Sequence, residues 1–132
     1  MEREDPEGVP WAGMRVLVCD DEPSIRLLFR TAFERLGADV HDAADGDRCL
    51  VRATEVVPEI VVLDLLMPGL DGLATLPRLR RLLPSAALFV VSAHASREVF
   101  DQGLAWGADA CFDKLAFLDR IPDLLRGVQL ST

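Results

Sequence analysis

Reactive side chains stand at the ends of four short apolar runs in this sequence. Three carboxylates, one hydroxyl and one ammonium occupy these positions, and they belong to Asp20, Asp21, Asp64, Ser92 and Lys114. Carboxylates gathered around one point repel each other and retain protons unless a cation neutralises them. Mg²⁺, which prefers oxygen ligands, would together with the ammonium keep one carboxylate ionised and nucleophilic. This combination predicts a phosphoryl-transfer site at the ends of the runs.

Each of these residues has a chemical role in that prediction. Asp64 attacks phosphorus and becomes an aspartyl phosphate, while Asp20 and Asp21 supply carboxylates to Mg²⁺, directly or through water. Lys114 stabilises charge on the phosphoryl oxygens, and Ser92 donates a hydrogen bond to them. Lys114 is the only lysine among 14 basic residues, which favours a need for a compact ammonium there. Taken singly, the two neighbouring aspartates also fit a helix cap, and the serine fits a turn.

Apolar runs alternate with segments of helical period along the chain, which predicts an α/β fold. Strands are expected at Arg15–Cys19, Ala38–Ala43, Glu59–Leu63, Ala87–Val91 and Asp109–Asp113. Helices are expected from Glu22 to Gly37 and over Gly46–Thr54, Leu73–Leu83, 96–105 and 116–126. Pro77 interrupts the third helix, which therefore either kinks or starts near Leu76. The alternation predicts a doubly wound five-stranded parallel sheet that binds its ligand at the carboxyl ends of the strands.

Four stretches of the sequence resemble the receiver domain of two-component response regulators. They are VLVCDDEPSIR, IVVLDLLMPGLDG, VVSAHA and GADACFDK, and together they cover about residues 14–126. The resemblance implies a flavodoxin-like sheet with strand order 2-1-3-4-5. It also implies that Asp64 is the phosphoacceptor and, with the acidic pocket of Asp20 and Asp21, a ligand of Mg²⁺. The remaining implied roles are a metal-binding backbone carbonyl, a switch hydroxyl and a phosphate-contacting ammonium, at Leu66, Ser92 and Lys114.

Two positions near Lys114 depart from the pattern of that family. The family has Tyr or Phe three residues before the lysine, whereas this chain has Cys111 at that switch position. A cis-proline follows the lysine in the family, but Leu115 follows it here. A trans bond is expected, because a cis bond before a residue other than proline costs about 3–4 kcal/mol.

The resemblance implies a signalling domain that accepts a phosphoryl group from a histidine kinase or a phosphotransfer protein. Such a domain assists its own phosphorylation and dephosphorylation without being an enzyme in the usual sense. It then changes its partner or its self-association, which leaves a homodimer open. The alternative is a receiver-shaped interaction module whose switch is impaired by Cys111 and Leu115.

Two enzymatic or nucleotide-binding alternatives fit the sequence less well. A phosphatase of the haloacid-dehalogenase type would carry a second Asp two residues beyond the nucleophile as general acid, but Leu66 stands there. The glycine-rich motifs G-x-x-x-x-G-K-[ST] and G-x-G-x-x-G do not occur in the sequence.

Composition limits the partners and the location of the chain. A net charge of −8 argues against nucleic-acid or membrane contact by this domain. The acidic start of the sequence does not resemble a secretory signal, and the apolar runs are too short to cross a bilayer, so a cytoplasmic protein is expected. We expect a receiver domain over residues 14–128, a flexible N-terminal tail over 1–13 and a C-terminal tail over 129–132.

Three cysteines make an odd count in this chain, and none of them belongs to a C-x-x-C pair. They are Cys19, Cys49 and Cys111. Cys19 and Cys111 lie in apolar stretches and are therefore expected to be small buried thiols in a reducing compartment. Trp11, in the N-terminal tail, is expected either to dock on the domain or to remain free of it.

Overall fold

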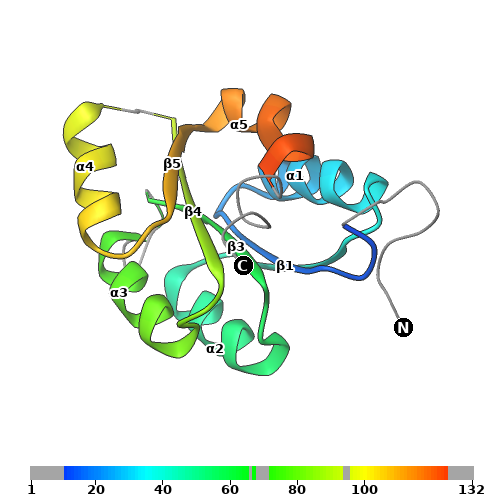
Figure 1. Cartoon of the computed structure of the whole chain (residues 1–132), viewed down its shortest axis with the longest axis horizontal. Coiled ribbons are helices and arrows are strands. Elements are labelled where there is room, and N and C mark those ends of the chain that lie inside the picture. The colour runs from blue at the N-terminus through cyan, green and yellow to red at the C-terminus, as the bar shows by residue number, and fades with distance from the viewer. Residues whose placement is uncertain (1–10, 66, 68–71, 94–95, 125–132) are drawn as a thin grey trace.

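A computed structural model of the chain describes residues 11–65, 67, 72–93 and 96–124. Strands and helices alternate along the chain, as Figure 1 shows. The strands are β1 (Arg15–Cys19), β2 (Asp39–Ala43), β3 (Ile60–Asp64), β4 (Ala87–Ser92) and β5 (Ala110–Asp113). The helices are α1 (Pro23–Arg35), α2 (Gly46–Val56), α3 (Gly72–Leu82), α4 (Arg97–Ala105) and α5 (Lys114–Arg120), which a 3₁₀ turn over Ile121–Asp123 extends.

The strands form one parallel sheet in the order β2-β1-β3-β4-β5, which confirms the predicted fold class. Each strand also starts and ends within one residue of its predicted bounds. Cys19 pairs with Leu63, and Asp64 pairs with Val91 on the next strand. This register aligns the carboxyl ends of β1, β3 and β4 along one edge of the sheet.

Two apolar clusters cover the two faces of the sheet. Helices α1 and α5 lie on one side of the sheet, and α2, α3 and α4 lie on the other (Figure 1). On the first side, Phe29 and Phe33 of α1 pack with Phe117 of α5 against the valines of β1. On the second side, Leu76 and Leu79 of α3 are fully buried. Alternate side chains of each strand point to opposite faces, so each of the five strands contributes side chains to both clusters.

Two helices start earlier than one or both of their predicted positions. Helix α3 starts at Gly72 and contains Pro77, so the predicted late start near Leu76 is wrong. Proline removes one backbone donor, and the burial of neighbouring leucines on the sheet compensates for that loss. Helix α5 begins at Lys114, earlier than predicted, because the side chain of Asp113 caps it by accepting a hydrogen bond from the Ala116 amide at 3.1 Å.

The end of the predicted N-terminal tail packs on the domain. Trp11 is only 2% exposed, and its ring lies 5.4 Å from the ring of Phe33. The Gly13 amide donates to the Gly37 carbonyl at 2.9 Å, which fixes the segment beside the end of α1. The expectation of a flexible tail up to residue 13 is therefore wrong for residues 11–13, while residues 1–10 lie outside the described residues.

Cysteine pairing also differs from the expectation of free buried thiols. The structure joins Cys19, the last residue of β1, to Cys49 of α2 as a disulfide. Their Cα atoms are 6.0 Å apart, a separation that a disulfide spans. The two residues are 30 positions apart in sequence, and only the packing of α2 on β1 brings them together. Cys111 is the free cysteine among the described residues.

Within the described part of the chain, no helix combines the length and the apolar character that crossing a membrane requires.

The burial of Trp11 predicts a large contribution to stability. Trp11→Ala should lower the free energy of unfolding by about 3–5 kcal/mol, because it removes a buried ring from the α1 face. Trp106→Ala is the matched control, since Trp106 is 45% exposed and should change stability by less than about 1 kcal/mol. Urea unfolding followed by circular dichroism measures both, and equal effects of the two substitutions would contradict this packing.

The disulfide predicts a defined pattern of thiol reactivity. When the unreduced chain is denatured in urea in the presence of N-ethylmaleimide, the reagent should modify Cys111 alone. A peptide map should then recover Cys19 linked to Cys49. Reduction of the Cys111→Ser variant should lower the free energy of unfolding by about 3–4 kcal/mol, because the bond closes a loop of some thirty residues. Modification of all three cysteines without reduction would refute the pairing.

Candidate functional site

Four elements bring the predicted site residues to one edge of the sheet. Asp20 follows β1 directly, and Asp64 is the last residue of β3. Lys114 follows β5 and opens α5, so its position is set by the Asp113 cap. Carboxylate oxygens of Asp20, Asp21 and Asp64 all lie within 4.8 Å of one another. The cluster that the strand ends predict is therefore present in the folded chain.

The Lys114 ammonium is the centre of this cluster. Its Nζ lies 2.9 Å from Oδ2 of Asp20 and 3.2 Å from Oδ2 of Asp64. Both carboxylates are almost fully buried, and Lys114 is only 6% exposed. Burial by itself lowers the pKa of Lys114, but the contacts with Asp20 and Asp64 outweigh it, so the pKa is raised overall. The ammonium therefore keeps its charge throughout the neutral pH range.

Asp20 is held by its neighbours as well as by Lys114. Its Oδ1 accepts a hydrogen bond from the Glu22 amide at 2.9 Å, and its carbonyl oxygen accepts one from Arg26 at 2.7 Å. Burial raises the pKa of the Asp20 carboxyl, whereas the Glu22 amide and Lys114 oppose that rise. A further cation beside Asp20 would therefore favour its ionised form.

The donor set of the cluster fits a hard divalent cation. Mg²⁺ takes oxygen ligands, and it usually keeps waters beside one or two carboxylates. Asp20 and Asp64 are buried, while Asp21 is exposed at the mouth and open to water. Beyond its ion pair with Lys114, the buried Oδ2 of Asp20 accepts no hydrogen bond from the residues that the structure describes. This oxygen is therefore suited to a metal ion.

Of the other two predicted site residues, the structure describes Ser92 but not Leu66. Ser92 ends β4 and is 1% exposed. The register pairs Asp64 with Val91, so Ser92 stands one residue further along the neighbouring strand and pairs with Asp113. Leu66, the predicted source of a metal-binding carbonyl, lies outside the described residues.

Comparison with known proteins identifies the family of this chain. The family model for the response regulator receiver domain matches residues 16–126. This chain belongs to the receiver domain family. Members of the family are phosphoacceptor signalling domains of two-component systems, so the cluster of carboxylates and lysine has the setting in which such chemistry occurs.

Two relatives show how receiver domains like this one are used in longer and shorter proteins. The transcriptional regulator RpaA of Synechocystis is 36% identical over 118 residues, which cover 85% of this chain and 49% of that protein. Sporulation initiation phosphotransferase F of Bacillus subtilis is 28% identical over 112 residues, which cover 85% of this chain and 90% of that protein. The chain spans about half the length of relatives such as RpaA.

A solved structure with the same fold comes from Burkholderia pseudomallei. It is a response regulator with a phosphorylated aspartic acid, a calcium ion and citrate, and it is 29% identical to this chain. The match covers 82% of this chain and 64% of the other, with a TM-score of 0.78. The structural likeness therefore extends over most of the receiver domain.

At the predicted switch position, Cys111, a small side chain packs against a glycine. Cys111 points toward α4, and a Cβ atom added to Gly103 would lie 2.9 Å from its Sγ. Burial raises the pKa of the Cys111 thiol, which donates to the Phe100 carbonyl at 3.5 Å. Phe112 points to the opposite face, as its neighbouring place in the strand predicts. Helix α4 therefore sits directly on β5.

Three contacts around the predicted site residues were not predicted from the sequence. Glu22 reaches Lys114 with its carboxylate at 3.4 Å, Arg26 binds the Asp20 carbonyl, and Gly103 receives Cys111. The contact of Glu22 could have been predicted from its position directly after Asp20 and Asp21. The other two depend on how α1 and α4 pack on the sheet, which periodicity does not specify.

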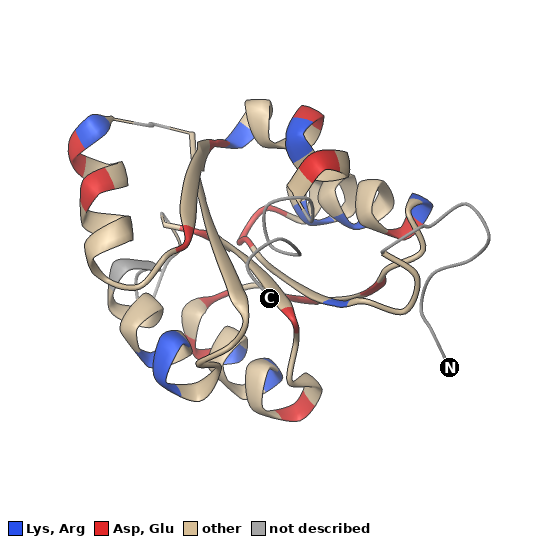
Figure 2. Cartoon of the chain, viewed as in Figure 1, with Lys and Arg blue, Asp and Glu red and all other residues tan. Residues whose placement is uncertain are grey.

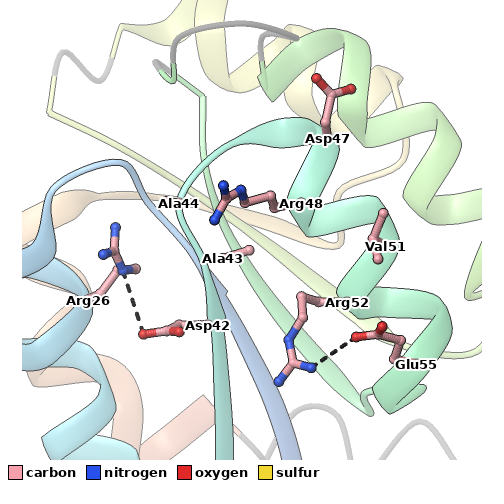
Figure 3. A pocket seen from close by; sticks show the side chains of 9 residues that line it. All are labelled: Arg26, Asp42, Ala43, Ala44, Asp47, Arg48, Val51, Arg52 and Glu55. Carbon is pink, nitrogen blue, oxygen red and sulfur yellow. Dashed lines mark hydrogen bonds and ion pairs between the residues drawn. The ribbon is translucent and has the colours of Figure 1, made fainter.

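A groove at the free edge of β2 is distinct from this cluster. It lies between α1 and α2, as Figure 3 shows, and arginines and acids line it. Arg26 pairs with Asp42 at 3.6 Å and Arg52 pairs with Glu55 at 3.0 Å, so opposite charges meet within the groove. Figure 2 shows basic and acidic residues together on α4 and on α5 as well. Among the described residues that line the groove, the arginines are therefore paired with acids and do not form a basic patch.

Proposed function

We propose that this receiver domain accepts a phosphoryl group on Asp64 from a histidine kinase or a phosphotransfer protein. The observation that carries the proposal is the buried contact of Lys114 with both Asp64 and Asp20. The residues in this contact supply a nucleophilic carboxylate, a fixed positive charge and carboxylate ligands for a metal ion at the carboxyl ends of the strands. The phosphorylated aspartic acid of the Burkholderia relative supports the same chemistry here.

In this proposal an oxygen of Asp64 attacks the phosphorus of the donor. A bond from carboxylate oxygen to phosphorus forms, and the bond from phosphorus to the donor nitrogen, or to acetate when acetyl phosphate is the donor, breaks. Lys114 binds a phosphoryl oxygen and stabilises the charge that develops on it, and Ser92 donates to another. Asp20 and Asp21 would hold Mg²⁺, which supplies further neutralisation of the phosphoryl charge.

The same groups act on the return path, in which water removes the phosphoryl group. Lys114 and the metal ligands stabilise the same charge in both directions, so the domain assists its own phosphorylation and dephosphorylation. The phosphorylated domain then signals by a change in partner or in self-association.

A second candidate function is a receiver-shaped interaction module with an impaired switch, and the contact of Gly103 with Cys111 favours it. When Ser92 moves toward a phosphoryl group it vacates space, and a thiol fills that space less well than an aromatic ring. Because Gly103 of α4 already packs on Cys111, a rearrangement of α4 and β5 would gain little free energy in this proposal.

Phosphorylation at Asp64 has a direct test. Incubation with acetyl phosphate and Mg²⁺ should add one phosphoryl group by intact mass, and peptide mapping should place it on Asp64. Asp64→Asn should abolish the label, and omission of Mg²⁺ should slow its formation. Asp39→Asn, which removes the same charge at the opposite end of the sheet, is the control and should be labelled like the parent. An undiminished label in Asp64→Asn would show the assignment to be wrong.

The switch has a separate test that uses beryllofluoride in place of the phosphoryl group. Amide NMR shifts with Mg²⁺ and beryllofluoride should change near Ser92 and Lys114 but only weakly along α4 and β5. Cys111→Tyr should enlarge the response of α4, whereas Cys111→Ser, matched in size, should not. A response that spreads over α4, β5 and α5 in the parent and stays the same in Cys111→Tyr would contradict the impaired switch.

A further inference from the structure

Three carboxylates share the ammonium of Lys114 in this structure. Besides Asp20 and Asp64, Oε1 of Glu22 lies 3.4 Å from Nζ. An ammonium has three N–H donors and no acceptor. Lys114 donates hydrogen bonds to Asp64 and Glu22 and forms an ion pair with Asp20. A phosphoryl oxygen that binds Lys114 must therefore displace one of these partners or share its donor.

The three partners differ in how easily they release the ammonium. The side chains of Asp20 and Asp64 are at most 3% exposed, so neither can exchange the ammonium for water without moving. The Glu22 side chain is 59% exposed and makes the longest of the three contacts. Its carboxylate can turn into solvent and recover its hydration, so Glu22 is the partner that gives way.

We propose that Glu22 is a positioning residue that holds one N–H donor of Lys114 until a phosphoryl group takes its place. The inference rests on the proposed function and adds to it a competitor for the phosphoryl oxygens. Glu22 occupies one side of the ammonium while Asp64 is unmodified.

Glu22→Gln isolates the carboxylate, because the Glu22 backbone amide that donates to Asp20 is kept. The variant should bind beryllofluoride in the presence of Mg²⁺ about two- to fivefold more tightly than the parent, the range expected for loss of an exposed ion pair. Its phosphorylation by acetyl phosphate should be faster by a similar factor. Titration of amide NMR signals gives the affinity, and intact mass against time gives the rate.

Two variants separate this role from a general effect of charge. Glu34→Gln removes one exposed negative charge from α1, the helix that Glu22 precedes. Glu34 pairs with Arg30 and not with Lys114, so this substitution should change neither affinity nor rate by more than about 1.5-fold. In a Lys114→Met background, Glu22→Gln should have lost its effect, because the ammonium for which Glu22 competes is gone.

The outcomes are distinct. An unchanged or weaker affinity in Glu22→Gln would overturn the positioning role, and so would a gain that persists in the Lys114→Met background or is matched by Glu34→Gln. In each of these cases the parent still takes up its phosphoryl group on Asp64. A parent that binds no beryllofluoride and takes up no phosphoryl group would instead overturn the proposed function itself.

Discussion

The ammonium of Lys114 allows the buried carboxylates of Asp20 and Asp64 to lie close together, because it forms an ion pair with both. Removing charged groups from water is costly, and a buried carboxylate without a partner would take up a proton or destabilise the fold. Asp20 and Asp64 come from the ends of neighbouring strands, and Lys114 comes from the end of β5, the outermost strand on one side of the sheet. The arrangement of the strand ends and the cluster of charges therefore depend on each other.

The sheet and its helices provide the rigidity that this cluster needs. Side chains of β1 and β3 are buried on both faces, so the strands that carry Asp20 and Asp64 have little freedom to move apart. The disulfide of Cys19 joins the end of β1 to α2 directly before the first carboxylate. Opposite them, Asp113 fixes the start of α5 and with it the place of Lys114. The site of closely spaced charges is thus built on buried, closely packed strands and a capped helix.

Much of this arrangement was predictable because parallel strands end at one edge. Apolar runs located the strands, and the residues that follow them located Asp20, Asp64 and Lys114. Periodicity could not predict contacts between elements that are distant in sequence, such as Cys19 with Cys49 or Gly103 with Cys111. The polar composition of the first residues suggested a flexible tail up to residue 13. The burial of Trp11 could not be predicted, because a single buried tryptophan leaves no periodic pattern in the sequence. The contact of Glu22 was missed since its carboxylate reaches Lys114 only across the mouth of the site.

We propose that Lys114 and a divalent cation neutralise the same carboxylates. The free energy of unfolding tests this proposal most directly. Urea unfolding of the parent and of Lys114→Met would be compared with and without Mg²⁺. Without Mg²⁺ the variant should lose about 3–5 kcal/mol, because buried carboxylates lose their partner. Mg²⁺ should stabilise the variant more than the parent, because the cation binds more tightly where the ammonium is absent. Equal stability of the two chains, or equal stabilisation by Mg²⁺, would contradict the account.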